Sequence, residues 1–306
     1  MTVLDFADTT SSTPTVTHVI PGGAPVTAVT SLGDDVFVVR DDHSQQVEVY
    51  DAVTSTLQRR LSVQSNPQST WSRAYKFKVI DGEIRGLGRL FGLAACAGNK
   101  CLYASDFINH RVHRVELSGS NAVTKWSVGR HPEGLTVNSA KNVLVVIRGE
   151  CQIQQFTTHG TLLQTIQLQP GIEEPRQVVE LSSGQFVISH TGTYHHRVCL
   201  LDVKGTVVRG YGGTPGSDLT TMNCPAGLAV DEHGNILVAD RDNNRLLVLD
   251  RSLTSAREMS VSIDGGLQGP WSLWYDKSRG RLYIGEWSGG RVIIIDNLKH
   301  FTASQV

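Results

Sequence analysis

The chain has 306 residues, of which 40% are hydrophobic and 19% are charged, and its formal net charge is −1. This composition provides a sizeable core, and the near-neutral charge argues against nucleic acid held across a broad face, because each phosphate contact uses a Lys or Arg. No segment approaches the roughly 18 consecutive apolar residues of a membrane-spanning helix, and the thirty glycines favour short strands joined by turns.

The N-terminal stretch 1–14 is rich in Thr, Ser and Asp and lacks the basic start and apolar run of a secretory signal. It predicts a flexible tail, and the segment after it, 15–20 (TVTHVI), predicts a strand. The five cysteines are odd in number and scattered, which favours a reducing compartment and a cytoplasmic protein. A disulfide between Cys96 and Cys101 across a predicted hairpin is the alternative left open.

Six related units follow, each with three short apolar runs separated by turns of Asp, Asn and Gly. The clearest unit is PAGLAVDEHGNILVADRDNNRLLVLD, which predicts strands at 227–230, 236–239 and 245–249. The six units begin at Pro25, Leu90, Pro132, Pro175, Pro225 and Pro270. Weaker fourth strands are predicted at 56–63, 122–128, 162–168, 206–210 and 256–261. From the second unit onward, the starts lie roughly 40 to 50 residues apart, the period of a propeller blade.

The sixth unit has no fourth strand of its own, because the chain ends soon after Asp296. The strand at 15–20 is left over at the other end, and pairing it with the last unit leaves no open gap in the ring. The sequence therefore predicts an all-β fold, a six-bladed β-propeller of four-stranded antiparallel blades closed by an N-terminal strand. This single domain spans 15–298 and is followed by a tail at 299–306.

The connection between the first two units is longer than the others and forms an insert at about residues 64–88. Its aromatic residues Trp71 and Tyr75 alternate with cationic residues such as Arg73. One interpretation is a binding lip, whose rings stack and whose cations meet an acidic peptide or RNA. The others are an extra hairpin packed on the blade, or a disordered excursion.

The repeated pattern resembles the NHL repeat family of β-propellers. The likeness rests on a Pro-x-Gly-Leu-x-Val opening, an Asp-x-x-Gly-x-Ile/Leu-x-Val-Ala-Asp middle and an Asn-x-Arg-Leu/Val ending. Residues 225–250 match almost throughout, while 90–117 and 270–296 keep parts of the middle and the ending. The first, third and fourth units keep only the apolar framework. The resemblance implies a recognition domain, like the C-terminal part of tripartite-motif ubiquitin ligases, whose RING is not found in this chain.

An acidic residue followed five positions later by an arginine recurs in the turns between second and third strands. The pairs are Asp106 with Arg111, Asp240 with Arg245, and Glu286 with Arg291. A motif repeated in several blades is usually there to build the blade, since Asp accepts hydrogen bonds from turn N–H groups and from Arg. We interpret these six as structural turn residues.

The same turns carry residues outside the repeated pattern, and loops on a rigid scaffold are where recognition residues concentrate. The candidate partner-binding residues are Phe107, His110, Tyr194, His195, Arg241, Asp242 and Trp287, with Trp71, Arg73 and Tyr75 of the insert. His190, His195 and His196 form a histidine cluster, but strand alternation separates the last two and no Cys or acidic residue completes a zinc tetrad. We therefore predict no metal.

Enzyme motifs are not found. There is no nucleophile elbow, zinc-protease motif or phosphate-binding glycine loop, and the amidating lyases of similar architecture use several histidines where this chain has His131 alone. We predict no catalytic residue, no cofactor and no membrane association. The predicted function is a macromolecular recognition scaffold, most consistent with a protein-binding adaptor in the ubiquitin pathway. The alternatives are an RNA-binding propeller, which acidic rim residues such as Asp41 oppose, and a propeller lyase or hydrolase.

Overall fold

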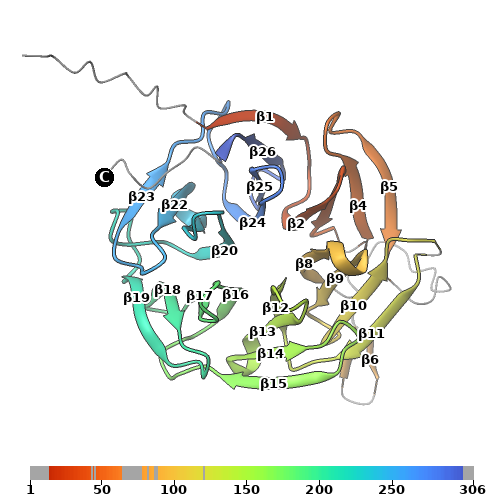
Figure 1. Cartoon of the computed structure of the whole chain (residues 1–306), viewed down its shortest axis with the longest axis horizontal. Helices are drawn as coiled ribbons and strands as arrows, with labels where there is room; N and C mark the ends of the chain where they lie inside the picture. Colours follow the sequence, from red (N-terminus) through yellow and green to blue (C-terminus); the bar gives the residue numbers. More distant parts are fainter. Residues whose placement is uncertain are drawn as a thin grey trace, which may run out of the picture.

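The computed structural model describes residues 14–42, 44, 46–63, 78–80, 83–85, 89–119 and 121–298. These residues form six four-stranded antiparallel sheets arranged in a ring around a central axis (Figure 1). The predicted six-bladed β-propeller is confirmed. No helix in these ranges is long and apolar enough to cross a membrane.

The blades follow one another in chain order, and each runs from an innermost strand to an outermost one. Blade 1 comprises β2 (Val26–Leu32), β3 (Asp35–Arg40), β4 (Gln46–Asp51) and β5 (Leu57–Ser62). Blade 2 comprises β8 (Leu90–Cys96), β9 (Cys101–Asp106), β10 (Arg111–Glu116) and β11 (Val123–Ser127), and blade 3 comprises β12 (Pro132–Val137), β13 (Val143–Ile147), β14 (Gln152–Phe156) and β15 (Leu162–Gln167). Blade 4 comprises β16 (Pro175–Glu180), β17 (Phe186–Thr191), β18 (His196–Leu201) and β19 (Val207–Gly213), and blade 5 comprises β20 (Pro225–Val230), β21 (Ile236–Asp240), β22 (Arg245–Leu249) and β23 (Ala256–Met259). Within the predicted insert, β6 (Lys78–Ile80) and β7 (Glu83–Arg85) form a separate two-stranded hairpin.

Blade 6 closes the ring with strands from both ends of the chain. It contains β24 (Pro270–Asp276), β25 (Arg281–Glu286), β26 (Val292–Asp296) and, as its outermost strand, β1 (Thr15–Ile20). The pairing of β1 with β26 is antiparallel, from Thr15 opposite Asp296 to Ile20 opposite Val292. The predicted closure by the N-terminal strand is confirmed.

The core lies between neighbouring blades. Leu246 of blade 5 belongs to one apolar cluster with Ile284 and Ile293 of blade 6, and Val38 of blade 1 belongs to another with Ile294. The second strand of each blade is buried on both faces, which is why it reads as a nearly continuous apolar run in the sequence. Because each blade packs on two neighbours, the stability of one blade depends on the blades beside it.

The glycine in the Pro-x-Gly opening marks the closest approach of adjacent innermost strands. A Cβ atom on Gly227 would lie 2.5 Å from the carbonyl oxygen of Trp271 and 2.8 Å from the nitrogen of Leu273. Gly92 and Gly134 occupy the same position in blades 2 and 3 and are equally crowded by the backbone of the next blade. In blades 2, 3 and 5 this glycine is therefore a packing requirement, whereas the other three blades carry Ala28, Gln177 and Ser272 at the equivalent position.

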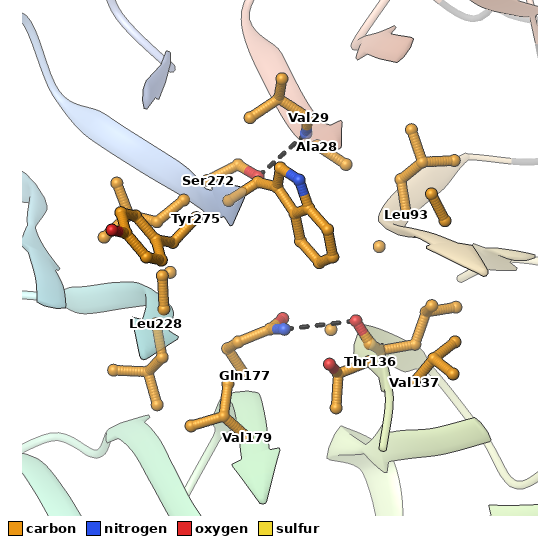
Figure 2. Close-up of a pocket in the computed structure, with 18 of the residues that line it drawn as sticks. Ala28, Val29, Leu93, Thr136, Val137, Gln177, Val179, Leu228, Ser272 and Tyr275 are labelled. Atoms are coloured by element: carbon orange, nitrogen blue, oxygen red, sulfur yellow. Dashed lines mark hydrogen bonds between the residues drawn. The ribbon is translucent and has the colours of Figure 1, made fainter. Parts of the chain in front are cut away.

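The innermost strands enclose a central channel of about 640 Å³, part of which is shown in Figure 2. At one end its lining includes the turns between first and second strands, through Gly33, Asn138 and Ser182. At the other end the lining stops at the second residue of each innermost strand, a set we call the closing layer. Its members are Thr27, Phe91, Glu133, Arg176, Ala226 and Trp271. All are buried except Arg176, which is partly buried.

Candidate functional site

The closing layer lies beneath the face formed by the turns between second and third strands, which we call the partner face. In an antiparallel blade the start of the first strand and the end of the second strand meet at the same edge. Register pairs such as Leu90 with Asp106 and Pro270 with Glu286 show this arrangement. Residues far apart in the sequence therefore converge around the axis on this face.

Four aromatic side chains from blades 2 and 6 form a cluster at the centre of the partner face. Phe91 and Trp271 are buried, while Phe107 and Trp287 are only partly buried. Ring centroids are 5.1 Å apart for Phe91 and Phe107, and 4.9 Å apart for Trp271 and Trp287. A stacked contact of 6.5 Å between Phe91 and Trp287 joins the two pairs. The cluster seals the channel and exposes two rings above it.

Three guanidinium groups lie over these rings. Arg89 is 4.7 Å from the Phe91 centroid, Arg176 is 5.3 Å from that of Trp271, and Arg241 lies within 5.6 Å of both tryptophans. Such cation–π contacts hold each guanidinium plane in a fixed orientation while its edge can still donate hydrogen bonds. We call the four rings and three arginines the aromatic–arginine platform.

Carboxylates balance the charge of the platform. Arg89 is paired with Asp41, and Arg176 is paired with Glu133 at 2.6 Å. Arg241 has a weaker partner, because Asp242 lies 3.5 Å away and its side chain is 43% exposed. Arg241 is therefore the platform cation best able to accept a new anionic partner.

Two histidines of this face, His110 and His131, lie beside the platform. His131 stacks on Phe107 with centroids 4.7 Å apart, and His110 meets His131 edge-on at 5.3 Å. Partial removal from water and the positive charges of His110, Arg130 and Arg148 lower the pKa of His131. The lowered pKa favours the neutral form of the His131 imidazole.

A family model described as the NHL repeat matches residues 222–249, which cover the opening, middle and ending of the blade 5 pattern. The chain is a β-propeller with an NHL repeat in blade 5.

Solved structures similar to this NHL propeller belong to proteins of several kinds. A catalytically inactive histidine-to-alanine variant of virginiamycin B lyase from Staphylococcus aureus, with quinupristin, is 11% identical, with a TM-score of 0.61 over 90% of this chain and 81% of that chain. Hydrazine synthase from Kuenenia stuttgartiensis is 15% identical, with a TM-score of 0.60 over 92% and 98%. A protein of unknown function from Bacteroides thetaiotaomicron is 14% identical, with a TM-score of 0.66 over 90% and 70%. At these identities the likeness shows the fold alone.

Two of the three acid–arginine pairs in the NHL turns are ion pairs. Arg245 donates to Asp240 at 2.8 Å, and Arg291 donates to Glu286 at 2.6 Å. The two arginines also donate to backbone carbonyls of the connection that precedes their blade, such as those of Ser217 and Gly266. Each pair therefore fixes the polypeptide that joins one blade to the next.

Blade 2 of the NHL propeller holds its acidic turn residue differently. Asp106 accepts hydrogen bonds from Asn109 and, at 3.3 Å, contacts His113, whereas Arg111 is exposed. Although burial opposes ionisation, the hydrogen bonds from His113 and Asn109 hold the pKa of Asp106 below its ordinary value. His113 is two residues beyond Arg111 on β10, so it lies on the same face of that strand, where it is buried.

The candidate partner-binding residues lie in different parts of the NHL propeller. Phe107, His110, Arg241, Asp242 and Trp287 are gathered at or beside the platform. Tyr194 and His195 lie on the blade 4 turn, where Tyr194 is 73% exposed. Trp71, Arg73 and Tyr75 lie outside the described residues.

Sequence reasoning did not select Phe91, Trp271, Arg89 or Arg176 as contact residues, although they complete the platform. The first two and Arg176 occupy the variable position after the start of the first strand, which the repeat pattern leaves open. An aromatic residue or arginine at that position in several blades is the signal that could have identified them.

The described part of the chain contains neither a cluster of metal-ligating side chains nor a disulfide bond. No group of three or more His, Cys, Asp or Glu residues there could hold a metal ion. Cys96 and Cys101 face each other in the register of β8 and β9, but both are free thiols. Burial raises the pKa of Cys101, which keeps this thiol protonated and unreactive at neutral pH.

Proposed function

We propose that this NHL propeller is a recognition scaffold that holds a protein partner on the partner face. The observation that carries the proposal is the aromatic–arginine platform at the centre of that face. Tryptophan and arginine are the residues most enriched among those that dominate binding energy at protein interfaces. The family resemblance favours a cytoplasmic adaptor related to the substrate-recognition part of tripartite-motif ubiquitin ligases.

The platform is held in place before any partner arrives. Phe91 and Trp271 are fixed in the closing layer, and their contacts orient Phe107 and Trp287 above them. The side chains of Arg89 and Arg176 are already ordered by carboxylates. Binding would therefore cost little side-chain entropy, which is the main advantage of a preorganised interface.

The charge balance favours protein over RNA. Arg89, Arg176 and Arg148 on the partner face all form ion pairs with carboxylates of this chain. A surface that binds RNA through its phosphates needs cations that are free to replace counterions. The platform instead offers partly exposed rings and one weakly paired guanidinium, which suit a protein surface that carries a carboxylate.

Replacing Trp287 with alanine tests the proposal. We expect Trp287→Ala to weaken the captured partner's affinity by roughly 30-fold or more, as for a central interface tryptophan, with little change in thermal stability because Trp287 is partly exposed. The measurement is quantitative mass spectrometry of proteins captured from cell extract, followed by titration of the partner that is lost. Leu163→Ala, at a 49% exposed residue of the outer strand β15, is the matched control. If Trp287→Ala captured the same proteins as the wild type, the contact site would have to lie elsewhere on the molecule.

Filter binding with single-stranded and hairpin RNA separates the protein-binding proposal from the RNA alternative. We expect no retention at low salt. Retention that falls steeply across a salt series, by the counterion-release relation, would assign the partner face to RNA.

A second candidate function is a lyase activity, favoured by the lowered pKa of His131 on the partner face and by the likeness to virginiamycin B lyase and streptogramin B lyase. If the chain is a recognition scaffold, incubation with quinupristin will leave the compound unchanged by liquid chromatography. Consumption of quinupristin that disappears in His131→Ala would replace the scaffold proposal with the lyase.

A further inference from the structure

The central channel opens on the face opposite the platform and is blind at the closing layer. Its lining begins at the turns between first and second strands and stops at buried residues such as Phe91 and Trp271. A volume of about 640 Å³ is within the usual range for a small-molecule site. A ligand would therefore enter from one side only.

Equivalent positions of the six innermost strands form layers along the channel, and one of these layers contains a single charged side chain. Five residues beyond the start of each innermost strand, all six positions line the channel. They are Ser31, Ala95, Val137, Glu180, Val230 and Tyr275. The equivalent positions of the two flanking blades are apolar, Val137 in blade 3 and Val230 in blade 5.

Glu180 is partly exposed to the channel, and one oxygen of its carboxylate has no hydrogen-bond donor in the described part of the chain. Its Oε2 atom is buried and accepts no hydrogen bond there, and no ion pair of these residues includes Glu180. The other acidic residues of the channel differ: Glu133 is paired with Arg176, and Asp276 accepts hydrogen bonds from Ser31 and Ser278. A carboxylate oxygen that is buried without a donor costs free energy, and a cation in the channel would satisfy it.

Apolar and aromatic side chains make up much of the rest of the channel lining. Val179, Val137 and Val230 line the channel, and Figure 2 shows Val137 and Val179 among the lining side chains. Trp274, which also lines the channel, is partly exposed, and its indole nitrogen donates to Ser31 at 3.0 Å. This bond holds the ring in place as a wall for an apolar group.

We propose that the channel binds a small molecule with a protonated amine and an apolar body. The ammonium group donates to Glu180, and the apolar body lies against the valines and Trp274. The site is independent of the partner face, because the closing layer separates the two. A negative result here therefore leaves the protein-recognition proposal untouched.

The test compares three probes of the same size and shape. Phenethylamine carries the ammonium group, 2-phenylethanol is its neutral counterpart, and 3-phenylpropionate is its anionic counterpart. Binding is measured by calorimetry and by ligand-observed nuclear magnetic resonance. We expect wild-type protein to bind the amine at least about tenfold more tightly than the alcohol, as for a hydrogen bond to a charged group, and to reject the carboxylate.

Two variants make the result decisive. Glu180→Gln keeps the side-chain shape and removes the charge, so it should bind the amine and the alcohol equally. Thr136→Trp, at another lining residue, should block all binding by filling the channel. Thermal unfolding of both variants verifies that they fold. The proposal is overturned if wild-type protein shows no preference for the amine, if the preference survives in Glu180→Gln, or if no probe binds.

Discussion

Deletion of residues 1–20 will abolish the cooperative unfolding transition of this protein, whereas deletion of residues 1–13 will leave the transition in place. The first deletion removes β1, whose Ile20 is fully buried, and uncovers the edge of β26. β26 contains four consecutive buried residues, Val292–Ile295, so its free edge would also promote aggregation. Calorimetry and size-exclusion chromatography measure both effects.

A point substitution in β1 distinguishes the loss of one buried side chain from the loss of the whole closing strand. Ile20→Ala should lower the free energy of unfolding by about 2 to 5 kcal/mol, the usual cost of removing a large buried aliphatic side chain. The variant should still unfold cooperatively, at a lower temperature. A 1–20 deletion that melts like the full chain would show that five and three-quarter blades are sufficient for the fold.

Gly227→Ala should be strongly destabilising, although it adds only one methyl group. The new Cβ would meet the backbone of Trp271 and Leu273 at 2.5 and 2.8 Å, and backbone cannot rotate away as a side chain can. We expect a loss of about 3 kcal/mol or more in the free energy of unfolding, at or above the upper end for overpacked sites. Urea denaturation followed by circular dichroism measures it.

Gly213→Ala is the matched control for this substitution. Gly213 lies in the outer strand β19, and a Cβ there would meet nothing within 4 Å. The control should change stability little. If Gly227→Ala and Gly213→Ala had the same effect, the close approach of innermost strands would not explain the repeated glycine.

The ring could be predicted because the strand and turn patterns lie within single repeats, and because the number of repeats and strands can be counted in the sequence. The blade 5 pattern from Pro225 contains strands and turns that are readable within one unit, and the strand 15–20 was the only piece left to complete blade 6. Its pairing with β26 follows from the need to cover an edge, which does not depend on distant side chains.

The platform could not be predicted in the same way, because it depends on the geometry around the axis. Phe91 and Trp271 belong to blades 2 and 6 and meet only when the ring is closed with a particular radius. The spacing rule also missed His113, which contacts Asp106 in a unit where Arg111 fits the pattern. Sequence spacing identifies the residues that could contact Asp106, whereas burial in the folded blade decides which of them does.

Ring closure also determines how the molecule responds to tension. Thr15 and Asp296 are register partners, so the described chain enters and leaves the ring side by side on one blade. A pull between these two points would break the hydrogen bonds of β1 and β26 one pair after another, because antiparallel bonds run perpendicular to the strands. Mechanical failure would therefore begin at blade 6 under a small force, while the other five blades carry no load.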